Sequence, residues 1–123
     1  MKTKIVYSDK FLNNIGLFMK IGGITLYPFI VLREYYQNKG DYWLKKRERI
    51  VLHESIHIEQ QKELLVIPFY IIYILEWLIK LTIYGKKAYY NISFEREAYD
   101  NEFNKDYLAK RKRYAWIKLI FKK

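Results

Sequence analysis

Twenty residues from Leu64 to Ile83 are nearly all apolar, and any fold of this chain has to remove them from water. As a helix the stretch is long enough to cross a bilayer. It also contains Pro68 near its start, Glu76 in its middle and Lys80 one turn later. Charges at membrane depth cost about 3 kcal/mol each, although opposite charges four positions apart partly offset each other. We therefore expect a buried core helix, with a membrane-inserted or interfacial helix as the alternative.

The length and composition of the chain limit how many domains and which metal sites it can form. With 123 residues, 51% of them hydrophobic, the chain suffices for one domain with a modest core and is too short for two. We expect a β-rich part over residues 1–40, a helical part over 41–113 and a basic, aromatic tail over 114–123. Because cysteine is absent, a metal would have to be bound by His, Asp or Glu.

The net charge of +10 indicates a basic surface, which suits nucleic acid, an anionic membrane or an acidic partner. The basic residues form four short clusters without a nucleic-acid-binding signature, at 45–47, 86–87, 110–113 and 122–123. We interpret them as solvated helix faces and ends, with attraction to an anionic membrane surface as the alternative. Asp9 and Asn13 interrupt any apolar stretch of a secretory signal. The expected location is the cytoplasm, with membrane association as the alternative.

Strand and turn signals dominate the first forty residues. Segments 16–21 and 24–27 flank Gly22-Gly23, a pair that tolerates positive φ and predicts a two-residue hairpin turn. Pro28 lacks a backbone donor, so a strand continuing over 29–32 should lie at a sheet edge or bend at this proline. The sequence therefore predicts a β-hairpin or small sheet at the N-terminus.

Two helices are predicted next. Asp41 is suited to cap a helix over about 42–65, in which apolar residues and the two histidines recur at helical spacing. Pro68 disfavours helical geometry at the residue before it, so the chain should bend there. A second helix over about 69–84 should then end at Gly85, a natural C-cap.

A third helix should begin near Asn91 or Ser93 and extend to at least Arg113. The apolar segment 114–121 either continues it or forms a short helix of its own. Taken together, these signals predict an α+β fold, with an N-terminal β-hairpin or small sheet packed on about three helices.

The string His53-Glu54-Ser55-Ile56-His57 lies within the first predicted helix. Residues four apart share a helix face with Cβ atoms about 6 Å apart, so both imidazoles can reach one tetrahedral Zn²⁺. Glu54 lies one step around the helix, where its carboxylate flanks the metal and can take a proton from metal-bound water. Both histidines of the chain are in this string, so a third ligand must be a carboxylate.

Glu95 is the best candidate for the third ligand. It shares a face of the predicted third helix with Ala98, whose small side chain would allow close packing against the first helix. Glu97 points about 200° away from Glu95 and is the substitute candidate. The alternative for Glu95 is a solvated first-turn acid that favours the helix dipole.

HExxH followed by a helix with Glu-x-x-Ala resembles the gluzincin metallopeptidases, most nearly the minimal single-domain gluzincins and the catalytic cores of membrane-associated CAAX-type and antibiotic-sensor-type proteases. The resemblance covers about residues 49–106, and its specific content is His53, Glu54, His57, Glu95 and Ala98. It implies zinc-dependent hydrolysis of peptide bonds. Many relatives carry an Asp four residues after the third ligand, which orients one His. Here that position is Tyr99, with Asp100 next, and a tyrosine hydroxyl is a weaker orienter.

Other parts of a protease site are less specified. The stretch 24–32 is either an edge strand that pairs with an extended substrate or an ordinary sheet edge. Gln61 lies on the metal face and is better suited to lining the cleft than to binding zinc. The 13 tyrosines do not single out one that would stabilise an oxyanion.

These residues predict a zinc metallopeptidase, a hydrolase in which His53, His57 and Glu95 bind Zn²⁺ and Glu54 is the general base acting on a peptide or protein substrate. A non-catalytic or latent zinc-binding domain is the first alternative, and it predicts stoichiometric zinc without turnover. A basic membrane-surface protein without metal is the second, and it predicts liposome binding that weakens with salt.

Overall fold

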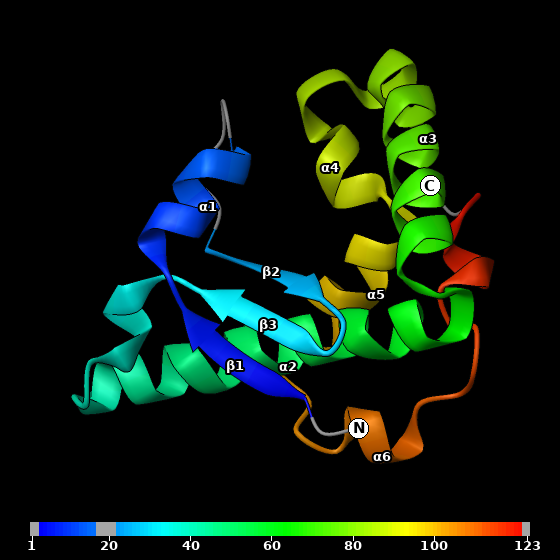
Figure 1. The fold of residues 1–123 in the computed structure, drawn as a ribbon. Helices are drawn as coiled ribbons and strands as arrows, with labels where there is room; N and C mark the ends of the chain where they lie inside the picture. Colours follow the sequence, from blue (N-terminus) through cyan, green and yellow to red (C-terminus); the bar gives the residue numbers. More distant parts are fainter. Residues whose placement is uncertain (1–2, 17–21, 122–123) are drawn as a thin grey trace.

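In the computed structural model, which describes residues 3–16 and 22–121, three short strands form one mixed sheet (Figure 1). The strands are β1 (Lys4–Tyr7), β2 (Gly23–Leu26) and β3 (Phe29–Leu32), in the order β1-β3-β2. The sheet packs on the helices, so the α+β architecture expected from the sequence is confirmed.

The central strand, β3, is the most buried of the three. It runs parallel to β1 and antiparallel to β2, so that Ile30 lies between Ile5 on one side and Thr25 on the other. Ile30 and Leu32 are fully buried, as expected for a continuous apolar run covered on both faces. Within the described part of the chain, β2 forms one edge of the sheet.

The hairpin lies between β2 and β3, with its turn at Tyr27 and Pro28, which are joined by a cis peptide bond. The predicted bend at Pro28 is therefore confirmed. A turn at Gly22-Gly23 is wrong, because Gly23 already pairs with Leu32 as the first residue of β2. The first strand of that predicted hairpin falls largely on residues 17–21, which lie outside the described residues.

A helix that the sequence did not predict, α1 (Asp9–Gly16), lies between β1 and β2. Its start is stabilised by Ser8, whose hydroxyl accepts a hydrogen bond from the Phe11 amide at 3.2 Å. After β3, the short 3₁₀ segment η1 (Glu34–Gln37) leads to the long helix that carries the histidines.

That long helix, α2 (Asp41–Leu64), has the extent predicted for it. Its N-cap is Gly40, without a side-chain capping bond, and Asp41 is the first helical residue. The predicted capping role of Asp41 is therefore wrong, although its negative charge still favours the helix N-terminus.

The break after α2 lies at Leu65, which has a φ of 68°. The next helix, α3 (Val66–Tyr84), thus starts before Pro68. Proline is tolerated there because amides in the first turn have no intrahelical acceptor. Gly85, with a φ of 57°, ends α3 as predicted.

The remaining elements are short: η2 (Gly85–Lys87), α4 (Ala88–Asn91), α5 (Ser93–Asn101), α6 (Tyr107–Lys110) and η3 (Ile117–Leu119). A continuous helix to Arg113 is therefore wrong. After α5 the chain turns back: the Asn104 amide bonds the Asn101 carbonyl, and the Asn104 side chain accepts a bond from the Asp106 amide. Such local side-chain bonds compete with helix continuation.

Two apolar clusters hold α2 in place. One joins the sheet to α2 and consists of Ile30, Leu32, Tyr36 and Ile58. The other joins α3, α5 and the C-terminal segment and consists of Phe69, Ile92, Phe94 and Trp116, with Leu64 packed against it. Both clusters therefore hold α2, the first from Trp43 to Ile58 and the second at Leu64.

The expectation that Leu64–Ile83 forms a buried core helix is wrong. In α3 the buried residues are Phe69, Glu76 and Lys80, while most of its aliphatic side chains are exposed. Among the described residues, the helical stretch Val66–Asn101, which begins with α3, is long and apolar enough to cross a membrane, and 17% of its apolar part is buried. The apolar surface therefore faces outward, and the two charges face inward.

Candidate metal centre

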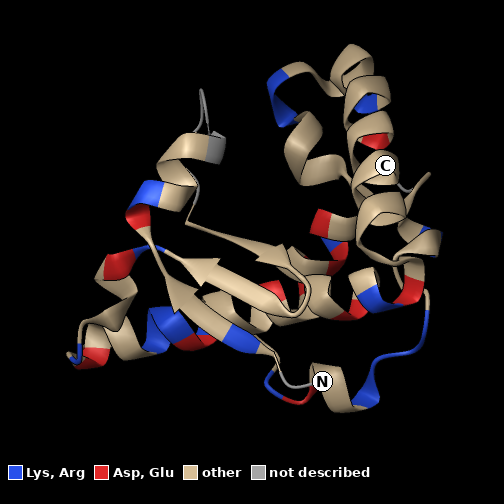
Figure 2. Ribbon diagram, in the orientation of Figure 1, with Lys and Arg blue, Asp and Glu red and all other residues tan. Residues whose placement is uncertain are grey.

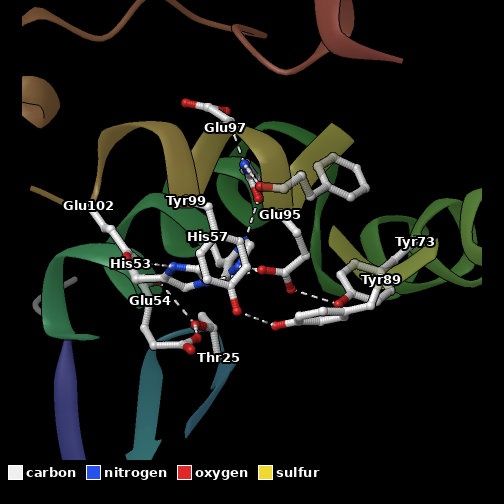
Figure 3. A network of polar contacts seen from close by, with 12 residues as sticks. Thr25, His53, Glu54, His57, Tyr73, Tyr89, Glu95, Glu97, Tyr99 and Glu102 are labelled. Carbon is white, nitrogen blue, oxygen red and sulfur yellow. Dashed lines mark hydrogen bonds and ion pairs between the residues drawn. The ribbon is translucent and has the colours of Figure 1, made fainter. Parts of the chain in front are cut away.

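The side chains of His53, His57 and Glu95 converge on one point inside the molecule (Figure 3). The two histidines lie one turn apart on α2, with ring centroids 5.0 Å apart. Ala98 is fully buried where α5 packs against α2, and Glu95 extends from the same helix toward the imidazoles. One ligand atom from each of the three residues lies within 4.8 Å of the other two, and all three side chains are buried.

The separations between these atoms suit a shared cation. Glu95 Oε1 lies 3.0 Å from His53 Nε2 and 3.1 Å from His57 Nε2. Two ligands of a tetrahedral zinc ion, each bound at about 2.0–2.1 Å, lie about 3.3 Å apart. Adjustments of a few tenths of an ångström would therefore accommodate the ion.

The hydrogen-bond partners of the two rings determine which ring nitrogen faces the shared point. Nδ1 of His53 donates to Glu102 Oε2 at 2.7 Å, and Nδ1 of His57 donates to Gln60 Oε1 at 2.7 Å. The Gln60 amide is held in this orientation because its nitrogen donates to the Phe94 carbonyl and to Glu97. A neutral imidazole that donates from Nδ1 has a lone pair on Nε2.

Two imidazole lone pairs and a carboxylate oxygen thus point at one another. Such a group of acceptors needs positive charge among its members, supplied by protons on the imidazoles or by a metal ion. Nitrogen and oxygen donors of this kind are ligands that Zn²⁺ accepts. The residues present therefore fit a divalent transition metal.

The charges at the site shift the pKa values of its members. Burial lowers the pKa of His53, but hydrogen bonds to Glu102 and Glu95 outweigh burial and raise that pKa to about 10. Burial likewise lowers the pKa of His57, and the negative charge of Glu95 more than offsets it, so this pKa is also raised. Burial raises the pKa of Glu95, but His57 and His53 bring it well below its usual range. Without a metal the group holds protons, which a metal must displace.

Glu54 lies outside this group and faces the sheet. The Thr25 hydroxyl donates to Glu54 Oε2 at 2.6 Å, which fixes the carboxylate between α2 and β2. Two cavities of about 360 and 140 Å³ open beside the group, and Gly23, Glu54 and Tyr89 line both of them. The carboxylate thus borders the space in which a ligand of the metal group would lie.

Two of the side chains that hold the histidines could have been found from their spacing but were not predicted. Glu102 follows the end of α5 and lies seven residues after Glu95, so both fall on one helix face. Gln60 lies three residues after His57 on α2. Tyr99, which the sequence suggested as an orienter, instead packs its ring edge against His53 and pairs its hydroxyl with Tyr89 at 3.3 Å. That prediction is wrong, because Glu102 occupies the orienting place.

Glu97 and Gln61 hold the surroundings of the site. Glu97 is buried away from the shared point, where Arg111 contacts it at 2.5 Å and Tyr107 donates to it at 2.6 Å. It is therefore an anchor for Gln60 and not a substitute for Glu95. Gln61 lines the smaller cavity, as predicted; its amide nitrogen donates to the Thr25 carbonyl of β2, and its amide oxygen accepts from the Tyr27 amide in the turn that follows.

Tyr73 of α3 is a further contact that the sequence did not indicate. Its hydroxyl donates to Glu95 Oε2 at 2.6 Å, opposite the oxygen that faces the histidines (Figure 3). Each of the three candidate ligands is therefore held by a second side chain. Ligand orientation by such outer partners is usual in protein metal sites.

No protein-family model matches this chain, and neither the curated proteins nor the solved structures contain a match to it. Function is therefore inferred from the chemistry of the site alone.

Proposed function

We propose that this chain is a zinc-dependent metallopeptidase in which His53, His57 and Glu95 bind the metal. The observation that carries the proposal is the buried group of three ligand atoms within 4.8 Å, each held by a second side chain. Three protein ligands leave a coordination position for water, as in catalytic zinc sites. When bound, zinc lowers the pKa of a water and polarises a substrate carbonyl.

Glu54 is the proposed general base. Its carboxylate is buried, borders both cavities and is held in place by Thr25. In the proposed reaction it takes a proton from the attacking water and delivers it to the departing amine. This assignment agrees with its place one step around α2 from His53.

Tyr89 is the proposed donor to the carbonyl oxygen. It extends from α4 and borders both cavities beside Glu54. Burial, together with the negative charge of Glu95, raises the pKa of its hydroxyl far above the usual range, so the group stays protonated. Removing one donor aimed at a developing oxyanion typically lowers kcat about 100- to 1000-fold.

The proposed substrate is an extended peptide that pairs with β2. The Gly22 carbonyl accepts from the Arg33 amide, so the alternation of an antiparallel pair turns the backbone groups of Gly23 and Thr25 away from β3. Gln61 and Tyr70 already bond the Thr25 carbonyl. Pairing with a substrate would therefore centre on Gly23, which lines both cavities.

Metal content and hydrolysis, measured together, test this function. We expect about one zinc per chain after gentle purification and its loss in His57→Ala. Glu54→Gln should keep zinc and abolish cleavage of a broad peptide library. Glu59→Gln is the matched control, since it makes the same change on α2 at a partly exposed side chain paired with Lys62.

Cleavage by Glu54→Gln at the rate of the unaltered chain would remove Glu54 from its role. Zinc in every variant but His57→Ala, with no cleavage by the unaltered chain, would favour the non-catalytic zinc domain. A chain that purifies without zinc and takes none up would refute both readings.

A further inference from the structure

The exposed surface of α3 is a continuous apolar stripe. Six aliphatic side chains that are 52–72% exposed recur at helical spacing along one side of the helix: Ile67, Ile71, Ile74, Leu75, Ile79 and Ile83. We call these six residues the outer face of α3. With 19 residues and a rise of about 1.5 Å per residue, the helix is about 28 Å long. An exposed apolar surface of this extent marks an interaction site.

The two charges of α3 are directed away from the outer face. Lys80 Nζ lies 2.7 Å from Glu76 Oε2 and also bonds the Asn91 carbonyl. Ser93 donates to Glu76 through both its amide and its hydroxyl, each at 2.6 Å. The charges are thus paired inside the protein. They would not enter an apolar phase in contact with the outer face.

Exposed basic residues lie on the segment that follows α3 and on the C-terminal segment that packs near it. Lys86 and Lys87 are exposed directly after the C-terminal end of α3. Near its first half lies the C-terminal segment, which places Trp116 in the same apolar cluster as Phe69 and carries the exposed Lys118. Figure 2 shows the basic segment that follows the C-terminal end of α3.

We propose that the outer face of α3 lies in the surface of an anionic lipid bilayer, with Lys86, Lys87 and Lys118 at the lipid headgroups. An apolar helix face bordered by Lys is the pattern of an interfacial helix, and each Lys near an anionic surface adds attraction. The charge of the chain, +10, complements such a surface. The same charge repels a second copy of the chain, which opposes self-association through this face.

The packing of α3 favours an interfacial position over a spanning one. Its inner side contacts α4 and supplies Phe69 and Tyr73 to the metal centre. A helix surrounded by lipid would have to leave these contacts. Lying in the interface keeps them, and it places the metal centre within about one helix diameter, roughly 10 Å, of the lipid.

Flotation of the full chain with vesicles tests the proposal. We expect it to float with phosphatidylcholine vesicles that contain about 30% phosphatidylserine, and to float less with pure phosphatidylcholine or at high salt. The double variant Ile71→Ser/Ile79→Ser should lose at least about tenfold in partition. Tyr42→Ser/Phe103→Ser is the matched control, because it removes two exposed apolar side chains elsewhere and should float unchanged.

A second pair of variants tests the charge contribution. Lys86→Gln/Lys87→Gln should lower binding to the anionic vesicles roughly tenfold or more. Lys39→Gln/Lys45→Gln removes the same charge far from α3 and should have a much smaller effect. Circular dichroism on each variant shows that the fold is kept.

Three outcomes would overturn the proposal. One is a chain that stays unbound with both kinds of vesicle. Another is an outer-face variant, still folded, that floats like the unaltered chain. The third is a dimer in light scattering that Ile71→Ser/Ile79→Ser converts to a monomer, which would assign the face to a second copy. None of these results depends on zinc or on hydrolysis, so this proposal can fail while the proposed function stands.

Discussion

Glu102 offers the sharpest test of the metal centre, because it touches His53 and not the shared point. Its carboxylate, 11% exposed, accepts from His53 Nδ1 at 2.7 Å. Glu102→Gln keeps an acceptor at nearly the same place but removes the charge. A hydrogen bond to a charged group contributes about 1.4 kcal/mol more than a neutral one. The zinc affinity of the fully deprotonated site should therefore fall about tenfold.

The size of this effect should depend on pH. Glu102 raises the proton affinity of His53 as well as its metal affinity, and without metal the His53 pKa is about 10. Below that pKa, zinc must displace a proton that Glu102 also stabilises, so removing the charge weakens both competitors. Above that pKa, His53 carries no proton to be displaced, so removing the charge weakens zinc binding alone. We expect the ratio of zinc dissociation constants, variant to unaltered chain, to be near one at about pH 6, to reach about five near pH 10, where half of His53 in the unaltered chain is deprotonated, and to approach ten above about pH 11.

Competition with a chromophoric zinc chelator across this pH range measures the ratio. Glu48→Gln is the control, since its carboxylate is exposed and pairs loosely with Lys105 at 3.7 Å. It should leave the ratio at one throughout. A ratio for Glu102→Gln that stays at one near pH 10, or that is largest at low pH, would refute the assignment of His53 Nε2 as the metal-binding atom.

Two further predictions concern the support of the site and its chemistry. Arg111→Met should lower the free energy of unfolding by about 3 kcal/mol in urea, because the side chain is 5% exposed and its loss leaves the buried carboxylates of Glu97 and Glu63 unpaired; Lys112→Met, on the exposed neighbour, should change it little. Tyr89→Phe should keep zinc and lower kcat about 100-fold if Tyr89 donates to the carbonyl oxygen, whereas Tyr90→Phe on the exposed next residue should not.

The convergence of the three candidate ligands could be predicted because each step was local. Four-residue spacing on a helix determines that His53 and His57 share a face, whatever else the chain does. With no third histidine and no cysteine, a carboxylate on a later helix was the remaining choice. Ala98, one turn from Glu95, indicated which helix could approach closely. Helical geometry and elimination were enough for this part of the site.

The end of α5 could not be predicted from helical periodicity. Glu102 lies just past the end of α5, which the sequence placed more than ten residues too late, at Arg113. The turn there depends on side-chain bonds of Asn104 that are weak signals in a sequence. The strand order could not be predicted either, because parallel pairing of β1 with β3 is a long-range contact and nothing local to either strand specifies it.

The direction in which α3 faces explains the largest error and links the two proposals. The presence of two charged residues in α3 suggested a core helix and not a membrane helix. The positions of these charges on the helix carry more information than their number. Glu76 and Lys80, four apart, share one side of the helix, and the outer face occupies another. Which side meets the protein is decided by partners on later segments, Ser93 and the Asn91 carbonyl, that form hydrogen bonds with this pair. Tyr73 reaches Glu95 because the inner side is the polar one. The orientation of α3 about its own axis, which directs Tyr73 toward the metal centre, therefore leaves the aliphatic residues of the helix exposed.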